Sequence, residues 1–251
     1  MKLVTFNIRC DYQQDGNNNF CFRQPLILEK LRREKPDIVC FQEVLPHVAA
    51  WLKEALPDYL VVGCGRSENL RDEQLTVACR KDRMNLIRME TFWLSETPGI
   101  PGSRYPRQSI CPRTGTEVLL EDLEDGYVFW LTNVHLDHEF PEARERGLAQ
   151  LLRRAREHPL FPSAPQIILG DLNAEADSPE LAALADSPFR NAAQGMGDTF
   201  HGFGRGEPPC AIDYILTQGF ACRGVEKWMD EQEGVYLSDH YPLCALLDPE
   251  G

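Results

Sequence analysis

Nine short apolar segments limit the architectures that this chain of 251 residues can adopt. They are rich in β-branched and aromatic residues, and in chain order they read LVTFNI, DIVCFQ, YLVVG, LTVAC, LIRMETFWL, YVFWLTNVHL, QIILG, AIDYILT and YPLCALL. Such segments predict strands. Several are almost continuously apolar, which is typical of strands covered on both faces. We therefore expect sheets that have another layer packed on each side.

Amphipathic stretches between these segments predict the covering layers. Helices are expected at residues 22–36, 46–57, 141–159 and 177–186, the last because an Asp-Ser pair and a proline occupy its start. Residues 95–113 are rich in proline, glycine and arginine and predict a long surface loop. An α/β sandwich of two sheets, with the helices outside, is the layer arrangement that satisfies this order of elements.

No internal repeat, low-complexity tract or change of composition marks a linker, so a single domain over residues 1–251 is expected. No apolar run is long enough for a transmembrane segment, and the opening MKLVTFNIRC reads as a first strand rather than a signal peptide. The nine cysteines are dispersed without CxxC spacing, which favours reduced core thiols over a zinc site or a disulfide framework. These features predict a cytoplasmic protein and leave its oligomeric state open.

The formal net charge of −13 bears on the partners of the protein. Duplex DNA carries about one negative charge per 1.7 Å of its axis, and proteins bind it mainly by neutralising that charge with Lys and Arg. The acidic balance instead favours a protein that holds divalent cations and a small anionic substrate. Binding of nucleic acid through a local basic patch or bound cations stays possible, although the charge does not favour it.

Polar side chains stand at the ends of six of the predicted strands. They are Asn7, Gln42, Glu43, Asn133, His135, Asp137, Asp171, Asn173, Asp213, Asp239 and His240. One such end, as in GDLN at residues 170–173, is also the ordinary sequence of a turn. If that strand stays extended, alternation points Asp171 and Asn173 to the same side. Six ends together are explained more simply by one polar cluster at one end of a sheet sandwich.

Six segments also carry a resemblance to a known family. FNIR, PDIVCFQEV, TNVHLDH, GDLNAEADSPE, IDYIL and SDHYPL occur in the order found in the endonuclease/exonuclease/phosphatase superfamily, which includes DNase I-like nucleases, abasic-site endonucleases, deadenylases and sphingomyelinases. VGCGR and FWLSETP look most like a bacterial branch of mainly uncharacterised hydrolases. The resemblance implies a four-layer αββα sandwich of two mixed, mostly antiparallel sheets with helices on the outer faces.

Phosphoester hydrolysis requires charge to be neutralised on the phosphoryl oxygens, a positioned water and a stabilised leaving oxygen. Mg²⁺ prefers hard oxygen ligands, and one or two carboxylates suffice. Glu43 is therefore the first candidate metal ligand, and the resemblance implies the same role. Its alternative is an acidic residue at the N-terminus of a helix. Asp239 and Asn7 are expected to complete the surroundings of Mg²⁺ or Mn²⁺, directly or through water.

Asp171 is the candidate to orient or deprotonate the attacking water, or to bind the metal, and Asn173 to hydrogen-bond a phosphoryl oxygen. His240 is expected to face the scissile phosphate, with its ring oriented by Asp213. The alternative for Asp213 is a buried structural carboxylate paired with an arginine. His135 resembles a histidine that contacts the phosphate or leaving group in the DNase I-like and sphingomyelinase branches.

Arg107 is the candidate substrate-binding arginine, because a guanidinium can grip two phosphate oxygens. Arg104 and Arg113, in the same segment, compete with it for this role. Asn133 is the second candidate substrate contact, and Asp137 and His138 could support His135.

Three functions follow as hypotheses. The first is a metal-dependent phosphoesterase that hydrolyses a phosphodiester or phosphomonoester by in-line attack of an activated water, with a small or lipid-like substrate favoured. The second is a DNA or RNA endonuclease or exonuclease that uses the same site. The third is a catalytically inactive binding protein, which is disfavoured because every motif position keeps a competent side chain.

Overall fold

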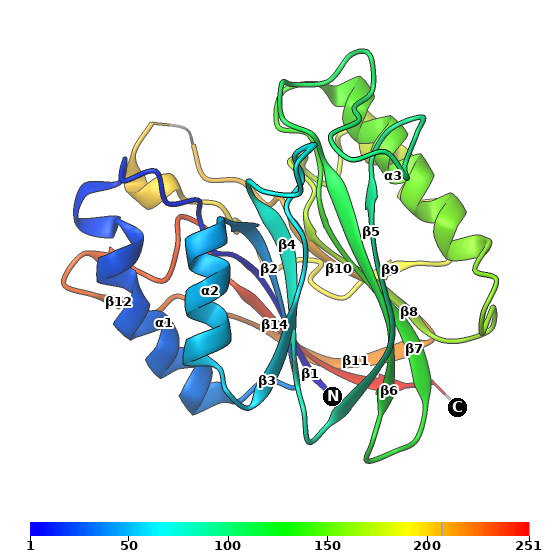
Figure 1. The fold of residues 1–251 in the computed structure, drawn as a ribbon, viewed down its shortest axis with the longest axis horizontal. Coiled ribbons are helices and arrows are strands. Elements are labelled where there is room, and N and C mark those ends of the chain that lie inside the picture. The colour runs from blue at the N-terminus through cyan, green and yellow to red at the C-terminus, as the bar shows by residue number, and fades with distance from the viewer. Residues whose placement is uncertain (207, 251) are drawn as a thin grey trace.

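The chain folds around two six-stranded sheets that pack face to face (Figure 1). The computed structural model describes residues 1–206 and 208–250. The first sheet has the order β11-β14-β1-β2-β4-β3, with bounds β1 Lys2–Asn7, β2 Ile38–Val44, β3 Tyr59–Val62, β4 Gln74–Arg80, β11 Phe220–Lys227 and β14 Leu243–Pro249. The second has the order β5-β6-β7-β8-β10-β9, with bounds β5 Met84–Trp93, β6 Thr114–Asp122, β7 Val128–His135, β8 Gln166–Asp171, β9 Arg190–Asn191 and β10 Asp213–Gln218. A small ribbon pairs β12 Glu231–Gln232 with β13 Val235–Tyr236.

Helices cover the two outer faces of this pair of sheets. The helices α1 (Phe20–Glu34) and α2 (Pro46–Ala55) lie on the first sheet, and α3 (Pro141–Arg156) lies on the second (Figure 1). Proline begins α2 and α3, where its missing N–H costs no hydrogen bond. The predicted αββα sandwich is confirmed. The helix expected at residues 177–186 is only a short 3₁₀ helix, Pro179–Leu184.

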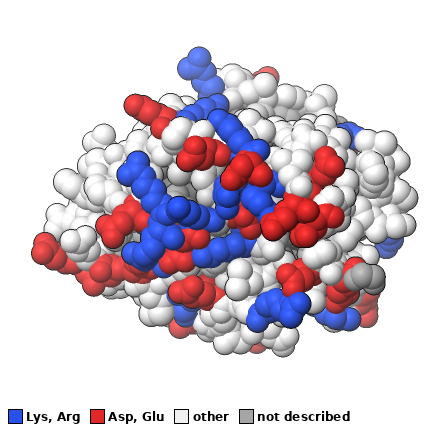
Figure 2. All heavy atoms as spheres, turned by 90° about the horizontal axis from the view of Figure 1, so that it is seen from below, with Lys and Arg blue, Asp and Glu red and all other residues white. Residues whose placement is uncertain are grey.

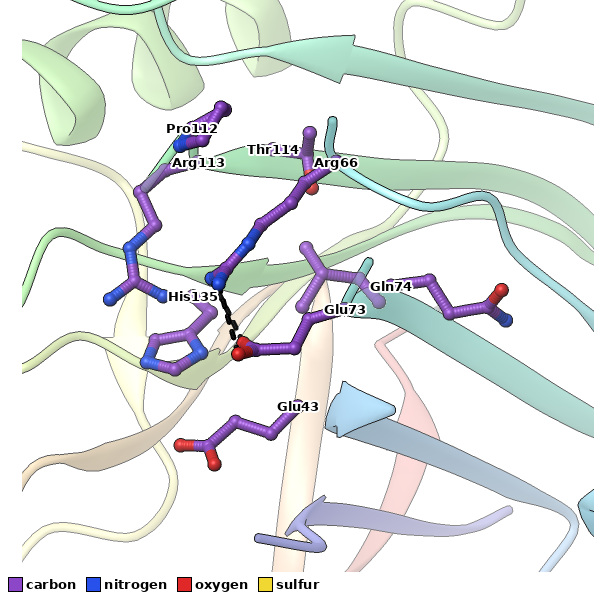
Figure 3. A pocket seen from close by; sticks show the side chains of 9 residues that line it. Glu43, Arg66, Glu73, Gln74, Pro112, Arg113, Thr114 and His135 are labelled. Atoms are coloured by element: carbon purple, nitrogen blue, oxygen red, sulfur yellow. Dashed lines mark hydrogen bonds and ion pairs between the residues drawn. The ribbon is translucent and has the colours of Figure 1, made fainter. Parts of the chain in front are cut away.

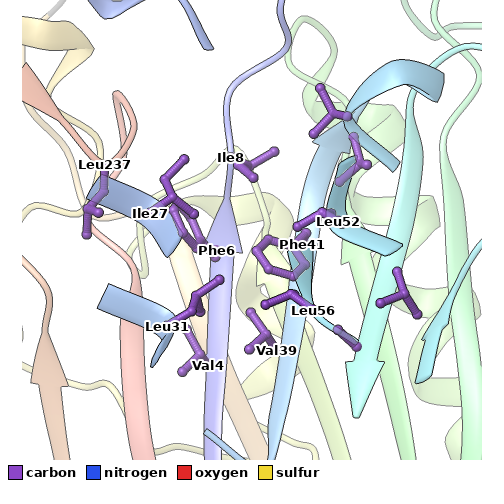
Figure 4. Close-up of a cluster of buried hydrophobic side chains, with 14 of the residues drawn as sticks. Val4, Phe6, Ile8, Ile27, Leu31, Val39, Phe41, Leu52, Leu56 and Leu237 are labelled. Carbon is purple, nitrogen blue, oxygen red and sulfur yellow. The ribbon is translucent and has the colours of Figure 1, made fainter. Parts of the chain in front are cut away.

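Alternate residues of the strands supply different apolar layers, which explains their nearly continuous hydrophobicity. Figure 4 shows Val4 and Phe6 of β1 facing Ile27 and Leu31 of α1. Leu3, next to Val4 in the chain, belongs instead to the layer between the two sheets. A third apolar cluster packs α3 against the second sheet. The central strands are thus covered on both faces, as the sequence predicts.

Strand β6 lies outside the nine predicted segments, although it occupies the interior of the second sheet. Its sequence, TGTEVLLED, begins with polar residues, and these are buried. The Thr116 hydroxyl donates to Leu75 O of the other sheet, and Glu117 forms an ion pair with Arg154. Polar residues that are satisfied by distant partners hide the strand from a search for apolar runs.

The described helices include none that is long and apolar enough to cross a membrane. All nine cysteines carry free thiols.

Parallel pairing sets where the predicted polar residues meet. Strands β1 and β2 are parallel, with Asn7 opposite Gln42, and strands β7 and β8 are parallel, with His135 opposite Asp171. The carboxyl ends of parallel neighbours lie at the same edge of a sheet. The polar ends of these four strands therefore come together at one end of the sandwich.

Candidate active site

Strand register brings an imidazole and two carboxylates side by side. His135 on β7 is opposite Asp171 on β8, and Asp171 is opposite Asp213 on β10. Directly opposed residues on adjacent strands project to the same face. His135 Nε2 lies 3.4 Å from Asp171 Oδ2, and all three side chains are buried. Asp171 is therefore the centre of a compact polar cluster.

Glu43 reaches this cluster from the first sheet. The register of β2 is irregular between Phe41 and Val44, and Glu43 has a φ of 63°, which is uncommon for a residue with a side chain. Its Oε2 accepts a hydrogen bond from Cys10 N at 2.7 Å, and its Oε1 accepts one from Asn7 Nδ2 at 2.9 Å. Burial raises its pKa, but His135 and these two hydrogen bonds bring the pKa below the usual range. The bulge thus holds an ionised carboxylate between the sheets.

Asn7 joins the carboxylates of the two sheets. Its Nδ2 also donates to Asp171 Oδ2 at 3.1 Å, while its Oδ1 accepts from Arg9 N. Asn7 therefore contacts both candidate carboxylate ligands, Glu43 and Asp171.

The GDLN segment leaves β8 through a turn. Asp171 Oδ1 accepts a hydrogen bond from Asn173 N at 2.8 Å, and Asn173 has a φ of 51°. Gly170 has a φ of 137°, and a Cβ there would lie 1.9 Å from Val134 O, so only glycine fits. The strand therefore does not stay extended through Asn173, and the alternative reading of GDLN as a turn applies. The turn nevertheless places Asp171 and Asn173 along the same cavity.

His240 contacts the same carboxylate. Its Nδ1 lies 2.8 Å from Asp213 Oδ2, its Nε2 lies 3.8 Å from Asp171 Oδ2, and Phe200 packs edge-on against the ring. Burial lowers its pKa, but Asp213 above all, with help from Asp239 and Asp171, raises the pKa of His240 to about 10. The imidazole is therefore protonated at neutral pH, and Asp213 orients it.

The carboxylates of this centre lie close together, and their burial and mutual repulsion disfavour the ionised forms. Candidate ligand atoms of Glu43, His135 and Asp171 lie within 4.8 Å of one another. Burial raises the pKa of Asp171 to about 7; His240 opposes this rise, and Asp213 and Glu43 add to it. Such repulsion is relieved by a cation, and carboxylate oxygens are the ligands that Mg²⁺ and Mn²⁺ prefer. The residues at this centre therefore fit a divalent metal ion.

Asp239 lines the same cavity but is paired with an arginine. Its Oδ2 lies 3.3 Å from Arg9 Nη1, and its Oδ1 accepts a hydrogen bond from the Ser238 hydroxyl. Arg9 also pairs with Asp15. A cation that takes Asp239 as a ligand would compete with Arg9 for this oxygen.

The cluster opens into a cavity of about 440 Å³. Eight residues predicted or considered from the sequence line it, namely Glu43, Arg113, His135, His138, Asp171, Asn173, Asp239 and His240. The remaining lining residues include Arg9, Arg66, Glu73, Phe200 and Ile212, none of which was predicted. Arg66 and Glu73 form a bidentate ion pair within the segment from Gly65 to Gln74, which precedes a strand and so escaped a search of strand ends (Figure 3).

Two candidate substrate contacts do not reach this cavity. The side chain of Arg107 is 74% exposed and pairs with Glu142 at 3.3 Å. Arg113, its competitor in the sequence, is buried and lines the cavity. Arg104 donates to Ser109 O and holds the loop. Of the arginines considered for substrate binding, Arg113 lines the cavity, whereas Arg107 lies at the surface.

Asn133 is fully buried and lies between the two sheets. Its Nδ2 donates to Phe41 O and Thr76 O, and its Oδ1 accepts from Gln42 Nε2 at 2.7 Å. Both hydrogens of the amide are used by the first sheet, so none is left for a substrate. The side chain fixes one sheet against the other, and the expected substrate contact is corrected to this positioning role.

We expect Asn133→Ala to lower the free energy of unfolding by about 2–4 kcal/mol, because three buried polar groups each lose one hydrogen bond and a cavity forms between the sheets. Urea unfolding measures this change. KM of the folded fraction should not change. A raised KM with unaltered stability would instead support substrate contact.

Asp137 supports the loop that carries Arg113. Its Oδ2 accepts from the backbone and hydroxyl of Ser109, and its Oδ1 accepts from Glu139 N and Phe140 N. All of these partners belong to the protein itself.

Comparison with known proteins places this geometry in context. A sequence model described as the endonuclease/exonuclease/phosphatase family matches residues 4–240. No curated protein matches the chain significantly.

Solved structures share the fold over their whole length. An endonuclease/exonuclease/phosphatase from Bacteroides vulgatus is 29% identical, with a TM-score of 0.92 and coverage of 99% of this chain and 98% of that one. A functionally unknown conserved protein from Enterococcus faecalis is 26% identical, with a TM-score of 0.90 and complete coverage of both chains. The mannosyl-6-phosphatase Bt3783 of Bacteroides thetaiotaomicron is 24% identical, with a TM-score of 0.88 and 99% coverage of each.

Proposed function

Because the chain belongs to the endonuclease/exonuclease/phosphatase family, whose members generally hydrolyse phosphoester bonds, we propose that it is a divalent-metal-dependent phosphoesterase. We further propose that its substrate is a small or lipid-like phosphorylated molecule. The observation that carries the proposal is the meeting of Glu43, His135 and Asp171, from both sheets, within 4.8 Å. An inactive binding protein has no need to hold buried like charges so close together.

Glu43 and Asp171 are the proposed metal ligands, with Asn7 holding the two carboxylates in place. A divalent cation bound there would neutralise phosphoryl charge and lower the pKa of a water. Asp171 lies between the two imidazoles, 3.4 Å from His135 Nε2 and 3.8 Å from His240 Nε2. A water near its carboxylate can therefore be oriented by Asp171, which acts as base or as ligand.

His240 and Asn173 supply the charge and hydrogen bonds around the phosphoryl group. His240 is protonated and directs Nε2 away from Asp213, so it can donate to a phosphoryl oxygen. One hydrogen of the Asn173 amide donates to Leu136 O, which fixes the side chain and leaves the second for a phosphoryl oxygen. Asp171 on β8 has His135 on one neighbouring strand, β7, and Asp213, the partner of His240, on the other, β10. We propose that His135 contacts the phosphate or the leaving oxygen.

Size and charge support a small substrate. A cavity of about 440 Å³ is within the range of small-molecule sites. The net charge is −13, and the cavity arginines Arg9 and Arg66 are each paired with carboxylates. On the face that carries the chain termini, shown in Figure 2, the Lys and Arg side chains are also interspersed with Asp and Glu. A duplex-binding face requires basic residues gathered without such neutralisation.

A panel of substrates tests the proposal. With Mg²⁺ or Mn²⁺, the protein should hydrolyse a p-nitrophenyl phosphoester, and EDTA should abolish the release of p-nitrophenol. Supercoiled plasmid and a single-stranded oligonucleotide, at matched phosphate concentration, should be cleaved much more slowly. Faster cleavage of either nucleic acid would favour a nuclease, and inactivity on every substrate with all metals would favour a binding protein.

A further inference from the structure

Arg113 is a buried cation without a carboxylate partner. It is 5% exposed, and among residues 1–206 and 208–250 no carboxylate oxygen lies within 4.0 Å of its guanidinium. Its Nε has no hydrogen-bond partner in the same part of the chain. The other two arginines of the cavity differ, because Arg9 pairs with Asp15 and Asp239, and Arg66 pairs with Asp72 and Glu73.

The neighbours of Arg113 do not neutralise it. Its Nη2 donates to His138 Nδ1 at 2.9 Å, which requires that nitrogen to be unprotonated. Glu73, and then Asp137, are close enough to raise its pKa, but Glu73 is paired with Arg66, and both oxygens of Asp137 accept hydrogen bonds from the loop. Burial, and then the charge of Arg66, lower the pKa of Arg113. A buried arginine in these surroundings is stabilised by an anion that comes from outside the protein.

The space beside the two arginines is narrow. Figure 3 shows the guanidinium groups of Arg66 and Arg113 directed toward His135 and Glu73. These residues line a recess of only about 10 Å³, to which the buried residues Leu75 and Thr114 also contribute. That volume holds about one water molecule. The recess therefore has no room for an organic group of a substrate.

Two apolar side chains also line the cavity. They are Phe200 and Ile212, and Phe200 packs against the imidazole of His240. An organic substituent on a phosphoryl group at the metal centre would find its apolar contacts at these two side chains.

We propose that Arg113, supported by Arg66, lines a narrow end of the cavity and binds a terminal phosphate there, so that the substrate is a phosphomonoester whose organic part contacts Phe200 and Ile212. This inference rests on the proposed function and specifies its substrate class. A phosphomonoester carries close to two negative charges and three terminal oxygens at neutral pH. A diester has one charge, two such oxygens and a second organic group, for which the recess of about 10 Å³ beside Arg66 and Arg113 has no space.

The test compares p-nitrophenyl phosphate with bis(p-nitrophenyl) phosphate in the presence of Mn²⁺. The native protein should prefer the monoester. Arg113→Gln should lower kcat/KM for the monoester by about 10²-fold, and for the diester by less than about threefold. Arg113→Lys, which keeps the charge, should retain more monoester activity than Arg113→Gln. Arg223→Gln is the matched control, because Arg223 is an exposed surface residue paired with Asp248.

Binding of inorganic phosphate provides a second readout. Phosphate should raise the melting temperature of the Mn²⁺-loaded native protein, and Arg113→Gln should remove most of that rise. Arg113→Gln should not lower the melting temperature without phosphate, because it removes an unpaired buried charge.

The outcomes separate the two proposals. Faster hydrolysis of the diester by the native protein, or an equal loss on both esters in Arg113→Gln, would overturn the monoester inference and leave the phosphoesterase proposal standing. Hydrolysis of neither ester would overturn both.

Discussion

Glu43→Gln is expected to lower kcat/KM by about 10³-fold or more, because the substitution removes the best-placed carboxylate ligand while keeping its shape. Metal ions contribute several kcal/mol to transition-state stabilisation in such reactions. Each 1.36 kcal/mol changes the rate tenfold, so a loss of about 4 kcal/mol accounts for a 10³-fold decrease. Glu43 is held by hydrogen bonds from Asn7 and Cys10 N, so no other carboxylate can take its position without rebuilding the β2 bulge.

Metal binding can be measured without turnover. Mn²⁺ at 100 times its Kd should stabilise the native protein by about 2.7 kcal/mol, and Glu43→Gln should abolish most of that gain. Glu54→Gln, on the exposed side of α2, is the control and should behave as the native protein does. Full Mn²⁺-dependent stabilisation and activity in Glu43→Gln would show that the metal lies elsewhere.

Asp171→Asn is expected to lower kcat by about 10²–10⁴-fold, the range associated with loss of a positioned general base. The carboxamide keeps the size of the side chain and can still accept a hydrogen bond from Asn173 N or Asn7 Nδ2. It carries no negative charge for the metal, the water or the two imidazoles. Steady-state kinetics in saturating Mn²⁺ measures the loss, and Asp186→Asn, which is exposed, is the control.

The same substitution should also reduce the loss of stability that the native protein shows as the pH rises from 5 to 7.5. The pKa of Asp171 is raised to about 7 in the metal-free fold, above the ordinary aspartate value of 3.8. Between these pH values the folded protein holds a proton that the unfolded chain has lost, so the Asp171 contribution to stability falls as pH rises toward 7. Asp171→Asn removes this fall. In EDTA, urea unfolding at pH 5 and pH 7.5 should therefore show a smaller loss of stability at the higher pH for the variant. If the variant lost as much stability between pH 5 and pH 7.5 as the native protein, Asp171 would not be the group with the raised pKa.

The fold class and most of the site are encoded locally. Apolar runs predict strands that are covered on both faces, and polar residues at the ends of six runs predict a common cluster. These signals are readable because strand alternation and strand termination depend on neighbouring residues. The structure places Glu43, His135, Asp171, Asp213 and His240 in contact or near contact, as the ordered motifs suggest.

Local patterns do not determine which loop side chain enters the cavity. Arg107 and Arg113 lie six positions apart in one irregular segment and have the same chemistry. Only the folded loop exposes the first and buries the second. Asn133 illustrates the same limit within a strand, because it stands at a polar strand end but faces the gap between sheets.

The amino-acid sequence alone determined the layers of the sandwich, the strands that end in polar residues and the type of chemistry that those residues can perform. The tertiary structure decided that Glu43 enters from a bulge, that Asn133 holds the sheets together and that Arg113, rather than Arg107, lines the cavity. The physical reason is that strand formation depends on residues that are adjacent in the chain, whereas burial and ion pairing depend on contacts between residues that are far apart in it.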